Sequence, residues 1–565
     1  MARTVSIGAQ GFEELRTHNA FYVDKTAFIS EWWSTLDKIT LITRPRRFGK
    51  TLLLDTVRCF FSTEFAERGE ELFGGLDVWD DPELRELQGT IPVVFLSFAD
   101  IKHTNYADTM YGIKELLREV AKTHSYLLDS ESVDEGDKTA LRSMSSSMSD
   151  AAASKSAKVL CQALEAHWGV KPVVLLDEYD TPMQAAWLGG YWDELSAFMR
   201  VFMDSTFKTN PSLDRGLMTG ITRVSRESIF SGLNNLRVCS VTSSAYATSF
   251  GFTEHEVFSA LDEFDMQDRK AKVKEWYDGF CFGEIESIYN PWSITLYLEE
   301  KVLVPYWMNT SDNALVADLV RRGDTQLKQD FEDLLDGRST THKIDDQLVF
   351  SDLEADTDAV WSLLLSSGYI TPVNDKDKEP LDPKELRLTN KEVFIGFDSV
   401  IERWFGRSRQ DYNGFIKAIL TGDERFATRY LQEVTLSCMS YFDGATRSAQ
   451  SEPERFYHGL VLGLLASLRG HYTVESNRES GWGRYDIMLV PTKDAQATDK
   501  AIIIEFKVFD KDDGETALED TATRALAQIE ERAYATALIE RGFSSENILS
   551  YGIAFRGKEV LVVQT

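Results

Sequence analysis

The residues with the clearest chemical signature form a short loop motif at residues 44–51. The letters RPRRFGKT follow the β-branched run ITLIT and precede the apolar-periodic LLLDTVRCFF, an order that predicts strand, loop and helix. A loop ending in Gly-Lys-Thr can bind phosphates, because backbone N–H groups surround them, the lysine contacts the outer phosphates and the hydroxyl binds Mg²⁺. The predicted nucleotide-binding residues of the loop are Arg44, Pro45, Arg46, Arg47, Phe48, Gly49, Lys50 and Thr51.

The first position of this motif departs from the usual GxxxxGK[ST] pattern, because Arg44 stands where a glycine is expected. A basic surface turn is the alternative interpretation, since Gly-Lys-Thr is common by chance. The strand before the loop, the helix after it and an acidic strand end further along the chain favour the phosphate-binding loop.

A second group of candidate residues follows the apolar run at residues 172–176. Asp177 and Glu178 come at the end of this predicted strand, where one carboxylate can hold Mg²⁺ and the next can orient an attacking water molecule. We therefore expect Asp177 to be a metal ligand together with Thr51, and Glu178 to be catalytic. A solvated strand end is the alternative, but it explains one acid more easily than a run that also includes Asp180.

A further predicted strand, RGLMTG, ends at Thr219 and Gly220, where a polar side chain can sense the γ-phosphate. Arg223 and Arg226 follow, and either could neutralise charge in the transition state. We include Thr219 and Arg223 in the predicted nucleotide site. Surface arginines that simply follow a strand are an equally simple interpretation.

A second site is predicted near the carboxyl end of the chain, where Asp486 and Glu505 lie on predicted strands. Lys507 follows Glu505 at a spacing of two, so both side chains project from one face. Two carboxylates on adjacent strands can bind Mg²⁺, and the lysine can position or activate water for phosphodiester hydrolysis. The alternative is an exposed sheet face with a Glu–Lys pair of little energetic value. Glu454 or Glu479 is a candidate third carboxylate.

These residues need elements that bring them together. Strands alternate with helices up to about residue 255, which predicts a parallel sheet with helices on both faces. A more helical region follows, and residues 359–395 resemble a winged-helix unit with a helix and a small β-hairpin. Strands and helices alternate again near the carboxyl end. The polar segment 442–454 predicts a domain boundary, so the expected domains are residues 1–260, 261–445 and 446–565.

The composition bounds the class of protein. A chain of 565 residues with 43% hydrophobic content can form several folded cores. Its five cysteines include no CxxC pair, and the N-terminus lacks a signal-like apolar stretch, so we expect a reduced, cytoplasmic protein without a membrane span. The net charge of −30 argues against indiscriminate nucleic-acid binding, because phosphate neutralisation needs lysine and arginine. This charge is still compatible with a nucleic-acid enzyme that binds its substrate in a local basic groove.

Taken in order, these motifs resemble those of AAA-ATPase-like proteins that carry a C-terminal PD-(D/E)XK nuclease domain. The resemblance begins at FYVDKT (21–26) and passes through RPRRFGKT and VVLLDEYDTPM (173–183) to IIIEFKV (502–508) and YGIAFRGKEV (551–560). It explains Arg44, since the family's loop typically reads RPRRFGK. It also implies that Asp486, Glu505 and Lys507 match the nuclease core, and that Glu454 matches its helical acid.

The resemblance implies an α/β fold with a P-loop NTPase sheet, a helical and winged-helix-like middle and a PD-(D/E)XK nuclease fold. The implied cofactors are ATP and Mg²⁺, with Mn²⁺ as a substitute, and the implied partner is nucleic acid, DNA or RNA, with a homo-oligomer left open. ATP would gate or drive cleavage, in a family whose members look like components of mobile-element or defence systems. The alternative is a regulatory or scaffolding nucleotide switch whose nuclease-like domain binds without cutting.

Overall fold

The computed structural model describes residues 2–9, 11–222, 230, 233–310, 325–335, 337–345, 357–373, 382–397, 409–438, 461–462, 464–465, 468, 472–476, 479–480, 483–492, 500–557 and 559–565. The chain divides into two compact units. The first comprises Met1–Leu319 and Gly337–Phe394, and the second comprises Val320–Asp336 and Ile395–Thr565. Within the described ranges, no helix is both long and apolar enough to cross a membrane.

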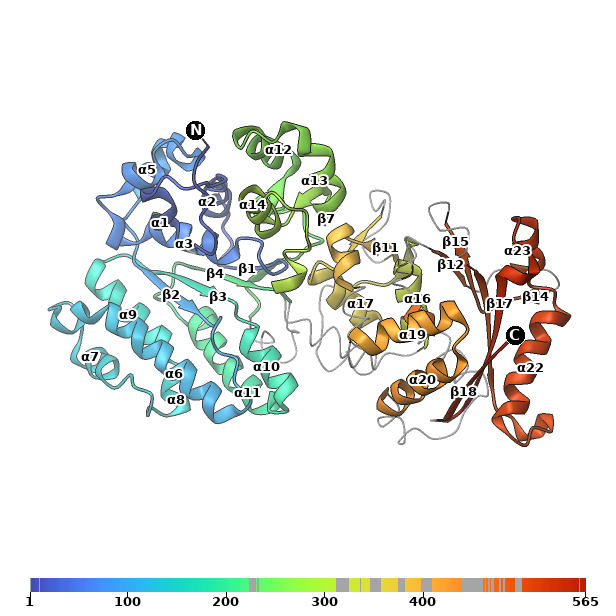
Figure 1. The fold of residues 1–565 in the computed structure, drawn as a ribbon. Helices are drawn as coiled ribbons and strands as arrows, with labels where there is room; N and C mark the ends of the chain where they lie inside the picture. Colours follow the sequence, from blue (N-terminus) through green and yellow to red (C-terminus); the bar gives the residue numbers. More distant parts are fainter. Residues whose placement is uncertain are drawn as a thin grey trace. The chain divides into compact units, whose positions relative to one another are not determined.

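A five-stranded parallel sheet forms the centre of the first unit (Figure 1). Its strands stand in the order β2-β3-β4-β1-β5 and comprise β1 (Ile39–Thr43), β2 (Val93–Ser97), β3 (Val173–Asp177), β4 (Arg215–Gly220) and β5 (Leu236–Cys239). β1 and β3 are buried throughout, which is why they read as continuous apolar runs. The predicted parallel sheet is confirmed. β5 was not predicted, because LRVC is short and carries a charge.

Helices cover both faces of this sheet, as the alternation of strands and helices predicts (Figure 1). α3 packs against β2, β3 and β4, whereas α6 and α9 pack against β2. The helices of this part are α1 (Phe12–Thr17), α2 (Ala27–Ser34), α3 (Lys50–Phe61), α4 (Gly69–Phe73), α5 (Pro82–Leu87), α6 (Tyr106–Thr123), α7 (Glu135–Arg142), α8 (Asp150–Ala153), α9 (Ser156–Trp168), α10 (Thr181–Gly189) and α11 (Trp192–Met203).

A β-hairpin interrupts the region after residue 255, which the sequence predicts to be mainly helical. β7 (Asp278–Phe282) and β8 (Ile285–Tyr289) pair antiparallel, and β6 (Phe252–Thr253) adds a strand beside β8. The helices around it are α12 (Glu254–Glu263), α13 (Lys270–Tyr277) and α14 (Pro291–Glu300). Aromatic residues favour these short strands, and Gly283, at φ +56°, makes the turn between them. The helical prediction therefore missed this hairpin.

A helix and a small antiparallel sheet complete the first unit. α17 (Thr357–Ser366) precedes β10 (Ile370–Pro372) and β11 (Lys384–Leu388), in agreement with the predicted helix and hairpin. β9 (Thr340–His342) pairs with the other edge of β11. After β11, Glu392 is fully buried and accepts hydrogen bonds from Ser293 Oγ at 2.8 Å and from the backbone N–H of Trp307 at 2.6 Å. Burial raises the pKa of Glu392 to about 7.

This buried carboxyl group makes stability depend on pH. Because the pKa of Glu392 in the folded chain lies above its usual 4.5, the folded chain binds more protons than the unfolded chain between these values. The stability that the protonated Glu392 gives the folded state is complete below the usual pKa. It is lost as pH rises through about 7, and the loss amounts to about 3 kcal/mol. We expect Glu392→Gln, which stays neutral, to show a smaller drop in urea midpoint than the wild type when pH is raised across this window. Equal drops would contradict this assignment.

The second unit is built on a mixed five-stranded sheet in the order β12-β15-β16-β17-β18. Its strands are β12 (Tyr472–Ser476), β15 (Ile487–Pro491), β16 (Ala501–Val508), β17 (Ile548–Arg556) and β18 (Glu559–Gln564), and a ribbon of β13 (Glu479–Ser480) and β14 (Gly483–Arg484) precedes β15. β16 and β17 are parallel, and the other neighbours in the sheet are antiparallel. The connection from β16 to β17 contains α22 (Leu518–Glu531) and α23 (Thr536–Glu540), and α22 packs on both strands.

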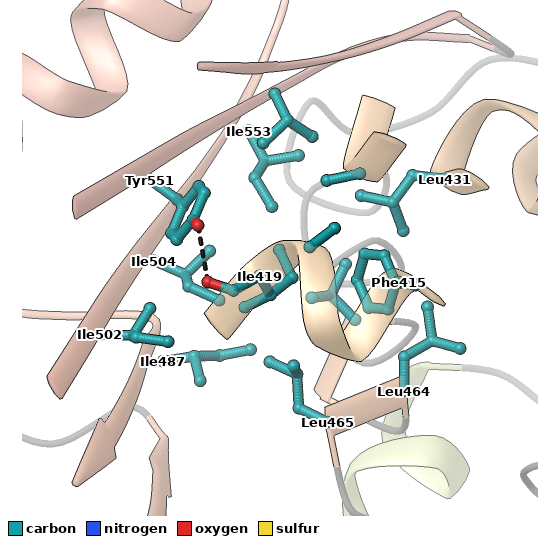
Figure 2. Packing of buried hydrophobic residues seen from close by; sticks show 14 of the residues in the cluster. Phe415, Ile419, Leu431, Leu464, Leu465, Ile487, Ile502, Ile504, Tyr551 and Ile553 are labelled. Atoms are coloured by element: carbon teal, nitrogen blue, oxygen red, sulfur yellow. Dashed lines mark hydrogen bonds between the residues drawn. The ribbon is translucent and has the colours of Figure 1, made fainter. Parts of the chain in front are cut away.

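One face of this sheet packs against helices that precede the predicted domain boundary. Ile502 and Ile504 of β16 belong to a core with α19 (Arg409–Thr421) and α20 (Glu424–Cys438), and Figure 2 shows this core around Ile419. The hydroxyl of Tyr551 on β17 donates to the carbonyl oxygen of Ile419 at 2.6 Å (Figure 2). The second unit also includes α16 (Thr325–Leu335). The boundary segment itself, 442–454, lies outside the described residues, so the limits of the three domains stay predictions.

The other face of the sheet packs against α22 and α23. Ala501 and Ile503 of β16 belong to this second core, which alternates with the first along the strand. Because the side chains of a strand alternate between its faces, Glu505 and Lys507 continue the row that begins with Ala501. Glu505 and Lys507 therefore share one face of the sheet, as their spacing predicts. This is the face that packs against α22.

Candidate functional site

The loop between β1 and α3 has the local geometry of a phosphate-binding loop. Gly49 caps α3 with φ +81°, a left-handed conformation that favours glycine, and Lys50 is the first residue of the helix. The N–H groups of the first helical turn and the positive end of the helix dipole make such a terminus suitable for an anion. Arg47 also has a positive φ, +65°, so the loop turns sharply twice before the helix begins.

The ammonium group of Lys50 lies inside this loop. Nζ donates to the carbonyl oxygens of Arg44 at 3.0 Å and Pro45 at 2.9 Å, and the residue is 5% exposed. Burial lowers the pKa of Lys50, and the charges of Glu178 and Asp177 oppose this shift. The lysine is therefore held beside the acidic end of β3, where it can exchange carbonyl oxygens for phosphate oxygens.

Two predicted site residues, Thr51 and Thr219, both contact a third, Asp177. Its Oδ2 accepts a hydrogen bond from Thr51 Oγ1 at 2.7 Å, and its Oδ1 accepts one from Thr219 Oγ1 at 2.6 Å. Asp177 is fully buried, and burial raises its pKa while the two hydroxyls lower it. The contact arises because β4 lies between β3 and β1, so the ends of all three parallel strands meet at one edge. Thr51 and Asp177 together present the oxygen ligands that Mg²⁺ prefers.

Glu178 and Asp180 differ in their environments. Glu178 is half-buried, and its positive φ of +50° costs about 1–3 kcal/mol in a non-glycine residue, a strain that is typical of functional sites. Asp180 is buried, and its Oδ2 accepts hydrogen bonds from Ile221 N at 3.1 Å and from Thr222 N at 2.9 Å. Asp180 therefore positions the segment after β4, a role that the sequence did not indicate.

The side chain of Arg44 anchors the start of the loop to the end of β5. It is fully buried and donates to the carbonyl oxygens of Cys239 at 3.2 Å and Ser240 at 2.5 Å, while its guanidinium lies 4.6 Å from the ring centroid of Phe282. Burial lowers the pKa of Arg44 to about 10. Because these contacts engage the guanidinium group, they disfavour the predicted binding of a nucleotide by the side chain of Arg44. Arg223 lies outside the described residues.

The predicted metal residues of the second unit also come together. Glu505 is 2% exposed, and its Oε1 accepts hydrogen bonds from Lys507 Nζ at 3.4 Å and from Gln528 Nε2. Asp486, just before β15, accepts a hydrogen bond from the backbone N–H of Phe506 at 2.8 Å. The burial of Glu505 rules out the alternative of an exposed Glu–Lys pair. Gln528 on α22 is a partner of Glu505 that the sequence analysis did not indicate.

The charge balance of this site fits a divalent cation. The second oxygen of Glu505, Oε2, is buried and accepts no hydrogen bond from any residue that the structure describes. Burial and the charge of Asp486 raise the pKa of Glu505 to about 8, and Lys507 opposes the shift. A cation bound between the two carboxylates would reverse this cost.

A third acidic ligand is not found in the described part of the chain. No group of three or more histidine, cysteine, aspartate or glutamate side chains gathers there. Glu454 and the side chain of Glu479 lie outside that part, so both stay predictions. Asp486 and Glu505 are thus the candidate metal ligands with described positions.

Comparisons with known proteins match two parts of the chain to known domain families. Residues 6–230 match the family of predicted AAA-ATPases, and residues 452–565 match the PD-(D/E)XK nuclease superfamily. The chain therefore carries an AAA-ATPase-like domain followed by a PD-(D/E)XK nuclease domain. It is also similar to an uncharacterized protein in the vnfD 5' region of Azotobacter chroococcum mcd 1, with 27% identity over 401 residues that cover 69% of this chain and 68% of that protein.

Proposed function

We propose that this chain binds and hydrolyses ATP at the loop between β1 and α3, and that ATP gates metal-dependent cleavage of DNA or RNA by the C-terminal domain. The observation that carries the first half is the meeting of Thr51, Thr219 and Asp177 beside the buried Lys50. The second half is supported by the buried Glu505, which faces Lys507 on the same strand.

Each residue of the nucleotide site has a chemical role in this proposal. Lys50 contacts the outer phosphates, and Thr51 and Asp177 hold Mg²⁺, which neutralises phosphate charge. Glu178 orients the attacking water molecule, and Thr219 contacts the γ-phosphate from the end of β4. The hydrogen bonds from Thr51 and Thr219 to Asp177 place these groups before nucleotide arrives.

In the nuclease site, Asp486 and Glu505 hold the metal ion, with Glu454 as a third candidate ligand. The metal ion would supply charge stabilisation for the phosphodiester and lower the pKa of a bound water molecule. Lys507 positions that water molecule, since it extends from the same face of β16 as Glu505. Gln528 keeps the carboxyl group of Glu505 in place through its amide N–H.

Gating requires that ATP binds two arrangements of the chain with different affinities. A complete switch from 1:99 to 99:1 takes about 5.5 kcal/mol of difference, so a partial effect is the realistic expectation. The net charge of −30 supports gating, because long-range attraction to nucleic acid is weak and access must be controlled locally. The alternative, a regulatory or scaffolding switch that does not cut, gives no role to the buried Glu505 beside Lys507.

Lys50→Ala tests the nucleotide half of the proposal. Removal of a charge-assisted contact should weaken binding of ATP with Mg²⁺ by about 1.5–3 kcal/mol, or roughly tenfold to 150-fold, as measured by calorimetry. Lys38→Ala is the matched control, because this exposed lysine lies just before β1 and donates to the carbonyl oxygen of Asp214. Unchanged affinity in the Lys50 variant would reject the site.

The gating half is tested by the cleavage rate of the full chain. We expect different rates without nucleotide, with a non-hydrolysable ATP analogue and with ATP, and we expect Lys50→Ala to make the three rates equal. Equal rates in the wild-type chain would mean that two independent activities share one polypeptide.

A further inference from the structure

The outer side of the phosphate-binding loop is held by two donors from distant parts of the sequence. The carbonyl oxygen of Arg46 accepts a hydrogen bond from Trp307 Nε1 at 3.1 Å and another from Asn290 Nδ2 at 3.3 Å. All three residues belong to the first compact unit. Trp307 is 1% exposed and Asn290 is fully buried, so both donors are largely shielded from water.

This pair of hydrogen bonds determines the direction of the next N–H group. A trans peptide is planar, and its C=O and N–H point in opposite directions. Because the carbonyl group of Arg46 is turned towards Trp307 and Asn290, the N–H of Arg47 is turned away from them, towards the phosphate side of the loop. The positive φ of Arg47, +65°, carries a conformational cost that these bonds offset.

Both donors are themselves fixed by their surroundings. Asn290 caps α14, where its Oδ1 accepts the N–H of Trp292 at 2.9 Å, which leaves its amide N–H to face the loop. The ring centroid of Trp307 lies 5.6 Å from that of Phe280, and its backbone N–H donates to Glu392 at 2.6 Å. The indole is thus held by contacts on both its ring and its backbone.

We infer that Trp307 and Asn290 are positioning residues of the nucleotide site: they hold the peptide between Arg46 and Arg47 so that the N–H of Arg47 faces the phosphates. The inference rests on the proposed binding of ATP at Lys50. Backbone N–H groups supply much of the phosphate recognition in such loops, so the orientation of one peptide affects affinity directly. Neither residue lies near the loop in sequence, and neither touches the nucleotide in this arrangement.

The test compares Trp307→Phe and Asn290→Ser with the wild-type full chain. Phenylalanine keeps an aromatic ring and loses the indole N–H, whereas serine keeps a helix-capping oxygen and loses the amide donor. We expect each variant to raise the KM for ATP about tenfold, which corresponds to about 1.4 kcal/mol. The change should fall mainly on KM, because an N–H to phosphate contact exists in both the ground state and the transition state.

Trp32→Phe is the matched control for a general loss of packing. Trp32 is fully buried, and its Nε1 donates to Thr40 Oγ1 at 3.2 Å near the opposite end of β1, so this variant loses the same kind of bond away from the loop. Its KM for ATP should change less than twofold. An equal rise in KM for Trp32→Phe and Trp307→Phe would overturn the inference.

Failure of the inference is distinguishable from failure of the proposed function. If Lys50→Ala raises the KM while Trp307→Phe and Asn290→Ser keep the wild-type value, ATP binds at the loop and the positioning role is rejected alone. If Lys50→Ala also keeps the wild-type value, the proposed nucleotide site itself is rejected. Circular dichroism of each variant verifies that the fold is retained.

Discussion

Glu505→Gln should reduce metal-dependent cleavage of nucleic acid at least about a thousandfold and leave ATP hydrolysis at the wild-type rate. The substitution keeps the size of the side chain and removes the charge that a metal ion needs, a loss of about 4 kcal/mol of transition-state stabilisation. The neutral amide should fold well, because burial already raises the pKa of Glu505 to about 8. Cleavage is measured with Mg²⁺ or Mn²⁺ on a panel of single-stranded and double-stranded DNA and RNA.

Glu515→Gln is the matched control for this prediction. Glu515 is also buried in the second unit, where it accepts hydrogen bonds from the backbone N–H of Asp510 at 2.8 Å and from Thr521 Oγ1 at 2.7 Å. Loss of this carboxylate should lower the melting temperature and preserve cutting. Asp486→Ala should match the loss in Glu505→Gln. Cleavage that persists in EDTA, or in the Glu505 variant, would reject the metal mechanism.

Glu178→Gln should bind ATP with wild-type affinity and hydrolyse it at least about a hundredfold more slowly. The amide keeps the shape of the side chain but cannot orient and polarise water as a carboxylate does, and such groups contribute roughly 10²–10⁴-fold. The strained backbone of Glu178, at φ +50°, indicates that this position is held for a purpose other than packing. Single-turnover hydrolysis and equilibrium binding, measured on the same preparation, separate the two effects.

The control for this variant is Glu165→Gln on α9, a partly exposed acid in the same unit. Its rate of hydrolysis should equal that of the wild type. A wild-type rate in the Glu178 variant would show that another group orients the water molecule.

The parts of the fold that could be predicted are those that local sequence determines. β1 and β3 are continuous apolar runs, and Gly49 stands where the chain must adopt a left-handed conformation. The spacing of Glu505 and Lys507 is enough to place them on one face, because the side chains of a strand alternate strictly. Such features need no knowledge of distant contacts.

Other parts depend on contacts between residues far apart in the sequence, which local patterns do not encode. The inward side chain of Arg44 is explained by distant contacts, among them the carbonyl groups of Cys239 at the end of β5 and Ser240 just after it. The hairpin of β7 and β8 was hidden because its strands are short and follow a helical pattern. The bond from Trp307 to Arg46 joins positions 261 residues apart, and no periodicity marks either one.

Because side chains alternate along β16, substitutions and deletions in this strand should have very different effects. Ile502 and Ile504 can drift among apolar residues of similar volume, because their neighbours can repack without moving the carboxyl group of Glu505. A deletion of one residue before Glu505 is different, since it turns every later side chain of the strand to the opposite face. The carboxylate would then enter the apolar core with α19 and α20, so stability and chemistry would be lost in one step. Substitutions at the apolar positions of this strand are therefore tolerable over evolutionary time, whereas changes in its length are not.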